Sequence, residues 1–166
     1  MSRTRSRDTV RCVIGHSTNA HGVAAAYWIL VIAILVTDQV TKTIAVVLLA
    51  PGVPVDLPGG AVRFLLVFNE QGPWGLSAGR HARPVLVLLT GASLLVLWAG
   101  TRRARWLSHT GAAALGVITG GVAGNLVDRL WSSRGVVDFI DVGVGTLNVA
   151  DLGIGVGVCL LVVEMG

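Results

Sequence analysis

The chain has 166 residues, of which 53% are hydrophobic and 13% charged, and its mean hydropathy is +0.74. A soluble globular domain carries about 25% charged residues, so the composition excludes that class and indicates one domain in a lipid bilayer. The net charge is +4, but the basic residues form short clusters between apolar segments. Such clusters orient membrane proteins, and we therefore expect no nucleic-acid partner.

Residues 1–21 are polar and contain Arg3, Arg5, Arg7 and Arg11. We predict that they form a flexible, basic cytoplasmic tail. An apolar run over 22–36 follows and continues helically through TDQVTK into IAVVLLA. A basic tail before an apolar run also resembles a secretory signal, but the later apolar runs and the lack of a small-residue cleavage pattern favour a retained helix.

Three further apolar runs predict helices over about 84–100, 108–127 and 147–166. About 20 helical residues cross the hydrocarbon core, so the second run is at the short limit. Residues 22–166 are thus expected to form a mainly α membrane domain with four transmembrane helices. Gly116, Gly120 and Gly124 recur every fourth residue, which predicts close contact with another helix.

A stretch at about 53–68 differs from these runs, because Pro-Gly-Gly separates two short β-prone segments. This pattern predicts a β-hairpin outside the membrane. The tail and the 101–107 connection together hold seven arginines and one acid, Asp8. The positive-inside rule therefore places both termini in the cytoplasm and the hairpin on the outer face.

Asp38 and Lys42 are four residues apart at the outer end of the first helix. The pair is either a helix-surface ion pair worth about 0.2–0.5 kcal/mol or an internal pair that supports the bundle. Asn125, Asp128 and Arg129 end the third helix. Asp128 and Arg129 are sequence neighbours, so they do not share a helix face, and we expect each to have other partners.

Asp138 lies in the apolar run VVDFI, and Asp151 follows Asn148 in LNVAD. Asp138 is either a solvated turn residue or turned toward a polar pocket, and Asp151 is either a helix cap or a functional acid. Two carboxyl groups close together in a low-dielectric cleft cannot both ionise easily, so one retains a proton while the other activates water. We expect Asp141 to be solvated.

Other chemistry has weaker support in the sequence. The serines lack a GxSxG setting, and the cysteines, Cys12 and Cys159, form no CxxC pattern. We therefore expect neither a metal nor a cofactor. Intramembrane acids also serve proton relays, but six of the nine acids crowd the outer side, which argues against an ion or proton carrier.

The motifs TDQVTK, FNEQGPWGL, GNLVDR, VVDF and LNVAD, in this order, resemble the lipoprotein signal peptidases (signal peptidase II) of bacteria. The resemblance implies four transmembrane helices, a small extracytoplasmic β-sheet and a helix lying on the membrane. It also implies an aspartic endopeptidase in the bacterial cytoplasmic membrane, which removes signal peptides from diacylglyceryl-modified prolipoproteins by cleaving before the lipidated cysteine.

By the same resemblance, Asp138 and Asp151 are the catalytic pair. The supporting and substrate-binding residues implied by the motifs are Asp38, Lys42, Asn69, Asn125, Asp128, Arg129 and Asn148. The implied partners are prolipoprotein substrates and membrane lipids, and the implied oligomeric state is a monomer. Gln71, where the family has glycine, and the short segment from Asp138 to Asp151 leave an alternative: a divergent paralogue that binds lipidated peptides without cleaving them.

Overall fold

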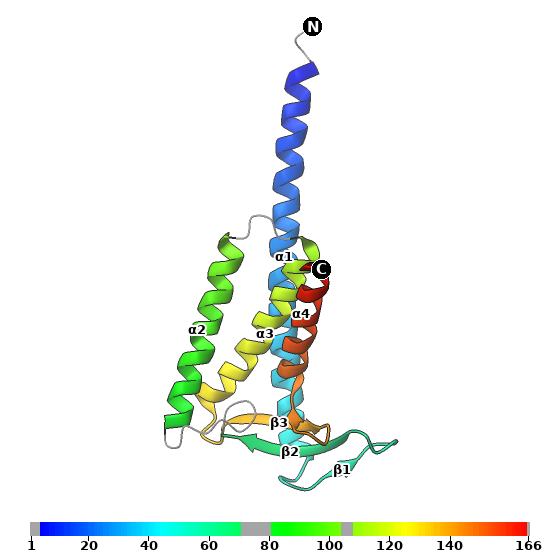
Figure 1. Ribbon diagram of the computed structural model, residues 1–166, viewed down its shortest axis with the longest axis vertical. Helices are drawn as coiled ribbons and strands as arrows, with labels where there is room; N and C mark the ends of the chain where they lie inside the picture. Colours follow the sequence, from blue (N-terminus) through cyan, green and yellow to red (C-terminus); the bar gives the residue numbers. More distant parts are fainter. Residues whose placement is uncertain (1–3, 71–80, 104–107, 166) are drawn as a thin grey trace.

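The computed structural model describes residues 4–70, 81–103 and 108–165, with side chains placed at 21–70, 81–101 and 108–165. These residues form four helices and a small sheet (Figure 1). The helices are α1 (Thr4–Leu48), α2 (Ala82–Arg103), α3 (His109–Trp131) and α4 (Val149–Met165). The strands are β1 (Val55–Asp56), β2 (Arg63–Asn69), β3 (Val136–Asp141) and β4 (Thr146–Leu147). The predicted fold class, mainly α with a small β-sheet, is confirmed.

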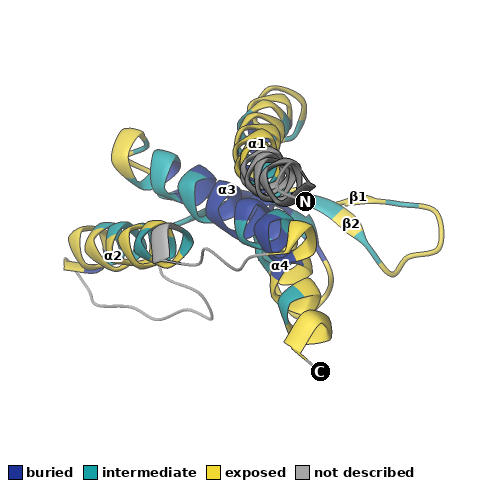
Figure 2. Cartoon of the chain, turned by 90° about the horizontal axis from the view of Figure 1, so that it is seen from above, coloured by how far each residue is buried: buried dark blue, intermediate teal, exposed yellow. Residues whose placement is uncertain are grey.

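Helix α3 is the central element of the bundle and packs against each of the other three helices. Seen along the bundle, its buried residues lie between α1, α2 and α4, whose outer faces are exposed (Figure 2). Those outer faces are apolar; Leu88 and Leu95 of α2, for example, are 72% and 66% exposed. An exposed apolar face of this extent is suited to contact with lipid.

Three helical segments in the described residues are long and apolar enough to cross a membrane: His21–Leu48, Ala82–Thr101 and His109–Trp131. Helix α4 has 17 residues, which correspond to about 26 Å at 1.5 Å per residue. That length is slightly less than a hydrocarbon core of about 30 Å. The chain is therefore multi-pass, and the fourth predicted crossing stays a prediction.

The first predicted segment differs from the structure. Helix α1 begins at Thr4, so residues expected to form a flexible tail continue the helix and project beyond the other helices (Figure 1). The physical reason is that no proline occurs before Pro51 and glycine occurs only at 15 and 22, so no strong helix-breaking residue separates the polar part from the apolar part. The cytoplasmic location of 1–21 stays a prediction.

The predicted glycine stripe is the contact between α3 and α1. A Cβ atom at Gly116 would lie 2.6 Å from the Tyr27 carbonyl oxygen, and one at Gly120 would lie 2.7 Å from that of Val31. Gly121 gives α4 the same close approach, since a Cβ there would lie 2.5 Å from the Ala150 carbonyl oxygen. Small residues allow helix backbones to approach this closely.

The predicted hairpin at about 53–68 is confirmed, and it is one part of a larger sheet. Strands β1 and β2 pair antiparallel, with Val55 opposite Phe64, and the turn between them contains Gly59 and Gly60 at φ 98° and 69°. Only glycine adopts these angles readily. The sheet order is β1-β2-β3-β4, and the sheet lies across one end of the helical bundle (Figure 1). Buried Leu66 and Val137 pack there against Ala45 of α1.

Candidate active site

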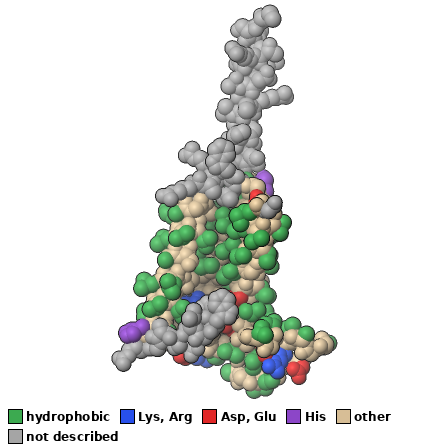
Figure 3. Space-filling model, in the orientation of Figure 1, with side chains coloured by type: hydrophobic (Ala, Val, Ile, Leu, Met, Phe, Trp, Pro, Cys, Tyr) green, Lys and Arg blue, Asp and Glu red, His purple; other side chains and the backbone are tan. Residues whose placement is uncertain are grey.

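Charged side chains on the visible face gather mainly where the helices meet the sheet, and apolar side chains cover the helices above them (Figure 3). At this end of the bundle, Lys42 of α1 makes two ion pairs. Its Nζ lies 2.7 Å from Asp38 Oδ2 and 2.8 Å from Asp128 Oδ2 of α3. The side chains of Asp38 and Lys42 are 0% and 4% exposed, so the internal pair is correct and the helix-surface alternative is wrong.

Both acids of this cluster have further partners, which offset the cost of burying charge. Asp38 Oδ1 accepts a hydrogen bond of 2.8 Å from the Ala150 amide of α4. Asp128 Oδ2 accepts one of 3.2 Å from the Val137 amide of β3. The cluster therefore ties α1 and α3 both to α4 and to the sheet.

Asn125 and Asn148 extend this cluster toward the two remaining acids. Asn125 Oδ1 accepts hydrogen bonds from Lys42 Nζ at 3.0 Å and from Asn148 Nδ2 at 3.1 Å. Asn125 Nδ2 donates to Asp151 Oδ1 at 2.9 Å. Asn148, which is fully buried, donates through Nδ2 to Asp138 Oδ1 at 2.6 Å.

Asp138 lies in the middle of β3, and its side chain faces this polar site. It is 2% exposed, so the solvated-turn alternative is wrong. Its Oδ2 accepts a hydrogen bond of 3.1 Å from Asn69, the last residue of β2. Burial raises the pKa of the Asp138 carboxyl from 3.8 to about 6; the nearby Asp151 also raises it, against opposing hydrogen bonds from Asn69 and Asn148. A raised pKa in a buried site is common among acids that exchange protons during catalysis.

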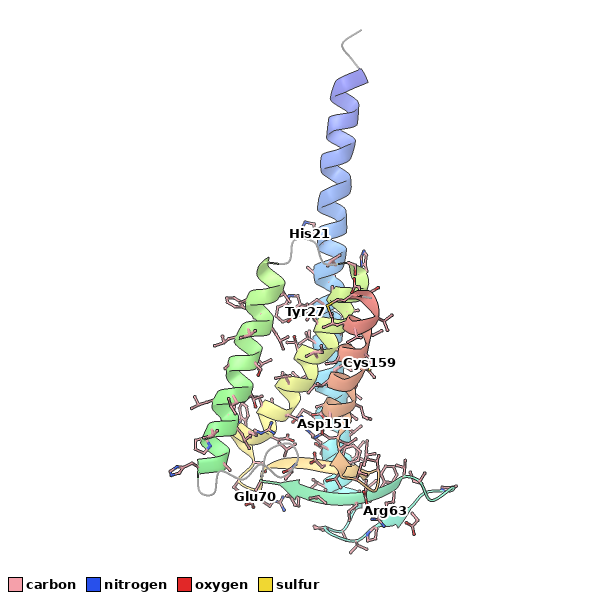
Figure 4. The ribbon with its side chains drawn as sticks, in the orientation of Figure 1. His21, Tyr27, Arg63, Glu70, Asp151 and Cys159 are labelled. Carbon is pink, nitrogen blue, oxygen red and sulfur yellow. The ribbon has the colours of Figure 1, made fainter. Side chains whose placement is uncertain are left out.

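Asp151 lies in the first turn of α4, at the end of this helix that faces the sheet (Figure 4). Its Oδ2 accepts a hydrogen bond of 3.2 Å from the Asn148 amide, and its own amide donates to Asn148 Oδ1 at 3.0 Å. This reciprocal pair is a capping box, so the cap role considered for Asp151 is real. Its Oδ1 nevertheless contacts Asn125 in the polar site, and capping does not exhaust its contacts.

Arg129 is partly exposed beside the pair, and its Nη1 donates to the Asn125 carbonyl oxygen at 3.3 Å. Asp151, Asp138 and Asp128 all act electrostatically on its guanidinium group. Asp128 is paired with Lys42, whereas Arg129 bonds to the Asn125 carbonyl oxygen, so the expectation that the two residues have different bonding partners is correct. The structure brings all nine predicted site residues into one connected region, but this does not test the role of any one of them.

The expectation that Asp141 is solvated is wrong. Asp141 is 5% exposed and forms an ion pair of 2.5 Å with Arg63 Nε across β2 and β3. The hydrogen bond and charge of Arg63 lower the pKa of Asp141, with a further contribution from the Gly143 amide. Strand register explains the difference, since Arg63 and Asp141 are direct partners in the sheet.

Two polar residues of the region were missed at the sequence level. Gln39 Nε2 donates to Asp38 Oδ2 and Asp128 Oδ1 at 3.2 and 3.1 Å, and Arg83 of α2 donates to the carbonyl oxygens of Arg129 and Leu130 at the end of α3. The position of Gln39 inside TDQVTK was the available signal. Gln71 lies outside the described residues, and the described residues contain no group of three or more His, Cys, Asp or Glu side chains suited to a metal ion.

The fold resembles that of two solved structures, both described as a bacterial membrane enzyme determined by the in meso method. The structure at 1.9 Å resolution has a TM-score of 0.75 over 85% of this chain and 92% of its own, at 22% identity. The one at 2.3 Å has the same TM-score and identity and is covered over 87% of its length. The chain is thus a multi-pass membrane protein with the fold of a bacterial membrane enzyme. A sequence profile described as Signal peptidase (SPase) II matches residues 30–166, and the chain belongs to the signal peptidase II family.

Individual relatives agree with this assignment. A protein of Mycobacterium tuberculosis (strain ATCC 25618 / H37Rv), named lipoprotein signal peptidase, is 38% identical over 138 residues, which are 80% of this chain and 66% of that protein. One of Mycobacterium avium (strain 104) with the same name is 39% identical over 136 residues, which are 78% of this chain and 72% of that protein. The chain thus spans about two thirds of the length of the first of these relatives.

Proposed function

We propose that the protein is an intramembrane aspartic endopeptidase that removes the signal peptide from diacylglyceryl-modified prolipoproteins, cleaving before the lipidated cysteine. Membership of the signal peptidase II family and the names of the relatives support this function. The observation that carries it is the position of Asn148, which donates to Asp138 at 2.6 Å and shares reciprocal backbone bonds with Asp151. Two acids thereby share one buried polar site.

The chemistry is that of a carboxyl pair with one proton. The charged acid takes a proton from water while the water oxygen bonds to the scissile carbonyl carbon. The protonated acid gives its proton to the carbonyl oxygen, and a neutral diol forms. The first acid then passes its proton to the leaving nitrogen as the carbon–nitrogen bond breaks, and a diol hydroxyl returns a proton to the second. Both acids end as they began, and no cofactor enters the proton balance.

The remaining polar residues have supporting roles in this proposal. The buried Asn125 and Asn148 orient the acids, and Asn69, which is partly exposed, orients Asp138 and hydrogen-bonds the substrate backbone. Arg129 is partly exposed next to the pair and balances negative charge that develops on the substrate. Asp38, Lys42 and Asp128 hold α1 and α3 in register beneath the site.

The cellular setting follows from charge distribution. Seven arginines lie in the N-terminal 21 residues and the 101–107 connection, and we infer that these regions and both termini are cytoplasmic. The acid pair then lies at the outer face of the bacterial cytoplasmic membrane. There the diacylglyceryl chains remain in lipid while the peptide bond before the cysteine reaches the acids.

The proposal is tested with Asp138→Asn and Asp151→Asn in a gel-shift assay of a lipid-modified precursor. Loss of either acid should reduce processing by at least about 10²-fold, because acid–base groups contribute about 10²–10⁴-fold. Asp141→Asn is the matched control, since it alters an acid of the same strand that is paired with Arg63. Wild-type processing by either site variant would refute the assignment.

The same assay separates this function from the non-cleaving alternative. The names of the relatives favour cleavage. Wild-type protein that retains the diacylglyceryl-modified precursor but leaves it intact would instead support a binding protein.

A further inference from the structure

Lys42 is the single lysine of the chain, and all of its donors have partners in the buried site. Its Nζ lies within 3.0 Å of three oxygens, those of Asp38, Asp128 and Asn125. An ammonium group has three donors and no acceptor, so the Asn125 atom that faces Lys42 has to be its amide oxygen. Lys42, together with Asn148 Nδ2, which donates to the same oxygen at 3.1 Å, thereby fixes which way the Asn125 amide points.

The fixed amide controls what Asp151 can do. With Oδ1 toward Lys42, Asn125 presents its Nδ2 to Asp151 Oδ1 at 2.9 Å. The other oxygen of Asp151, Oδ2, accepts a hydrogen bond of 3.2 Å from the backbone N–H of Asn148. Both Asp151 oxygens therefore face groups that only donate, which favours the ionised carboxylate. The position of Asp151 in the first turn of α4 favours a negative charge as well.

Asp138 has a different environment. Asn148 faces its Oδ1, but its Oδ2 faces Asn69, whose amide oxygen has no hydrogen-bond partner among the described residues. If the Asn69 amide turned over, its oxygen would accept a hydrogen bond from a protonated Asp138 Oδ2, whereas turning the Asn125 amide would point its NH₂ group at the Lys42 ammonium. Asp138 is also the more buried acid, 2% exposed against partial exposure for Asp151, and burial favours the neutral form.

From this asymmetry, and resting on the function proposed above, we propose that Lys42 is a positioning residue that acts through Asn125 to make Asp151 the charged base and Asp138 the proton-bearing acid. Asp151 takes the proton from water, and Asp138 protonates the scissile carbonyl oxygen. Lys42 contacts neither substrate nor water in this scheme. Its effect on the reaction passes through one amide group.

A double-mutant cycle tests the path from Lys42 to Asn125. Lys42→Gln should lower kcat about 10- to 100-fold with little change in KM, since a glutamine can present either amide atom to Asn125. Asn125→Ala should also lower kcat, but adding Lys42→Gln to it should cause no further loss, because no amide remains to be oriented. Multiplicative losses in the double variant would overturn the proposal.

Two controls separate positioning from charge and folding. Arg63→Gln removes one positive charge from the same end of the protein and should leave kcat unchanged. Folding of each variant is checked by thermal unfolding in detergent. If Lys42→Gln does not fold, Asp38→Asn/Lys42→Gln removes Lys42 together with one of its two acids, and Asp128 keeps its donors from Gln39 and the Val137 backbone. The amide side chain introduced at position 38 retains an acceptor for the Ala150 backbone amide. This double variant should then lower kcat in the presence of Asn125 and cause no further loss when it is added to Asn125→Ala.

A second measurement does not depend on turnover. The charged groups around Asp138 and Asp151 are Lys42, Arg129, Asp38 and Asp128. At pH 5, the infrared band of a protonated carboxyl group should disappear in Asp138→Asn and persist in Asp151→Asn. The reverse pattern, or no change in either variant, would overturn the assignment of the proton. If wild-type protein does not cleave precursor, the proposed function fails, but the infrared result still decides where the proton lies.

Discussion

Two carboxyl groups on one strand, Asp138 and Asp141, have opposite environments. Asp138 is buried among amide groups, and its pKa is raised to about 6; Asp141 is paired with Arg63, and its pKa is lowered. A raised pKa means that the folded protein binds the proton more tightly than the unfolded chain does. The contribution of Asp138 to stability is therefore full below pH 3.8 and is lost as the pH rises through about 6.

This difference predicts a pH-dependent effect of Asp138→Asn. Relative to wild type, the variant should gain stability between pH 4 and 7, by up to about 3 kcal/mol for a shift of about two pKa units. Thermal unfolding in detergent across this range measures the effect. Asp141→Asn is the control of opposite sign, because Asp141 stabilises the fold above pH 3.8 and loses that effect only as the pH falls through its lowered pKa. A variant-minus-wild-type difference for Asp138→Asn that does not change with pH would contradict the prediction.

For individual residues, the sequence predicts which side chains belong to the site but not which hydrogen bonds and ion pairs they form. Motif order identifies Asp138, Asp151 and Asn148, and the apolar setting suggests that Asp38 and Lys42 pair internally. The partner of Asp141 was missed because it is Arg63, 78 residues earlier, and their contact depends on strand register. The direction of the Asn125 amide likewise depends on α1, α3 and α4 at once, and no local pattern encodes it.

Among the elements, α3 contributes most to the architecture because glycines line its contacts. Gly116 and Gly120 meet backbone carbonyls of α1, and Gly121 meets one of α4. The four-residue spacing predicted one of these contacts from sequence. The contact through Gly121 was not predicted, because a second glycine face is visible only when the position of α4 is known.

Alanine substitutions at two helical glycines test this packing. Gly120→Ala should destabilise the protein by about 1–3 kcal/mol, because its Cβ would lie 2.7 Å from the Val31 carbonyl oxygen and force α1 and α3 apart. Gly91→Ala in α2 is the matched control, since nothing lies within 4 Å of a Cβ there. It should leave stability unchanged or raise it by up to about 1 kcal/mol through helix propensity. Equal unfolding temperatures for the two variants would argue against close packing at Gly120.

For the whole molecule, the predicted orientation places the sheet outside the membrane and the opposite end of the bundle in the cytoplasm. His21 lies at the end of the bundle opposite the sheet, level with the upper end of α2 (Figure 4), and Val144 lies in the β3–β4 turn with 97% of its surface exposed. Hydropathy and arginine distribution predicted the spans and their direction. The helical continuation of α1 to Thr4 was missed, because a polar, arginine-rich composition suggests a flexible tail although no strong breaker interrupts the helix.

Cysteine labelling tests the orientation in intact bacteria. In a chain with Cys12 and Cys159 replaced by serine, a membrane-impermeant thiol reagent should modify Val144→Cys without lysis. It should modify His21→Cys only after the membrane is opened. Labelling of both positions before lysis would indicate mixed insertion, and the opposite pattern would invert the topology.

Asn148 has a consequence for how the protein is made. It lies just before α4, so Asn148 and Asp151 leave the ribosome after α1, α3 and strands β2 and β3 have been synthesised. Until then Asp138 lacks its donor at Oδ1 and the Asn125 amide lacks its acceptor. A chain synthesised only as far as β3 therefore holds no complete acid pair. Any hydrolytic activity of this site begins only after the start of α4 has been synthesised and has joined the site.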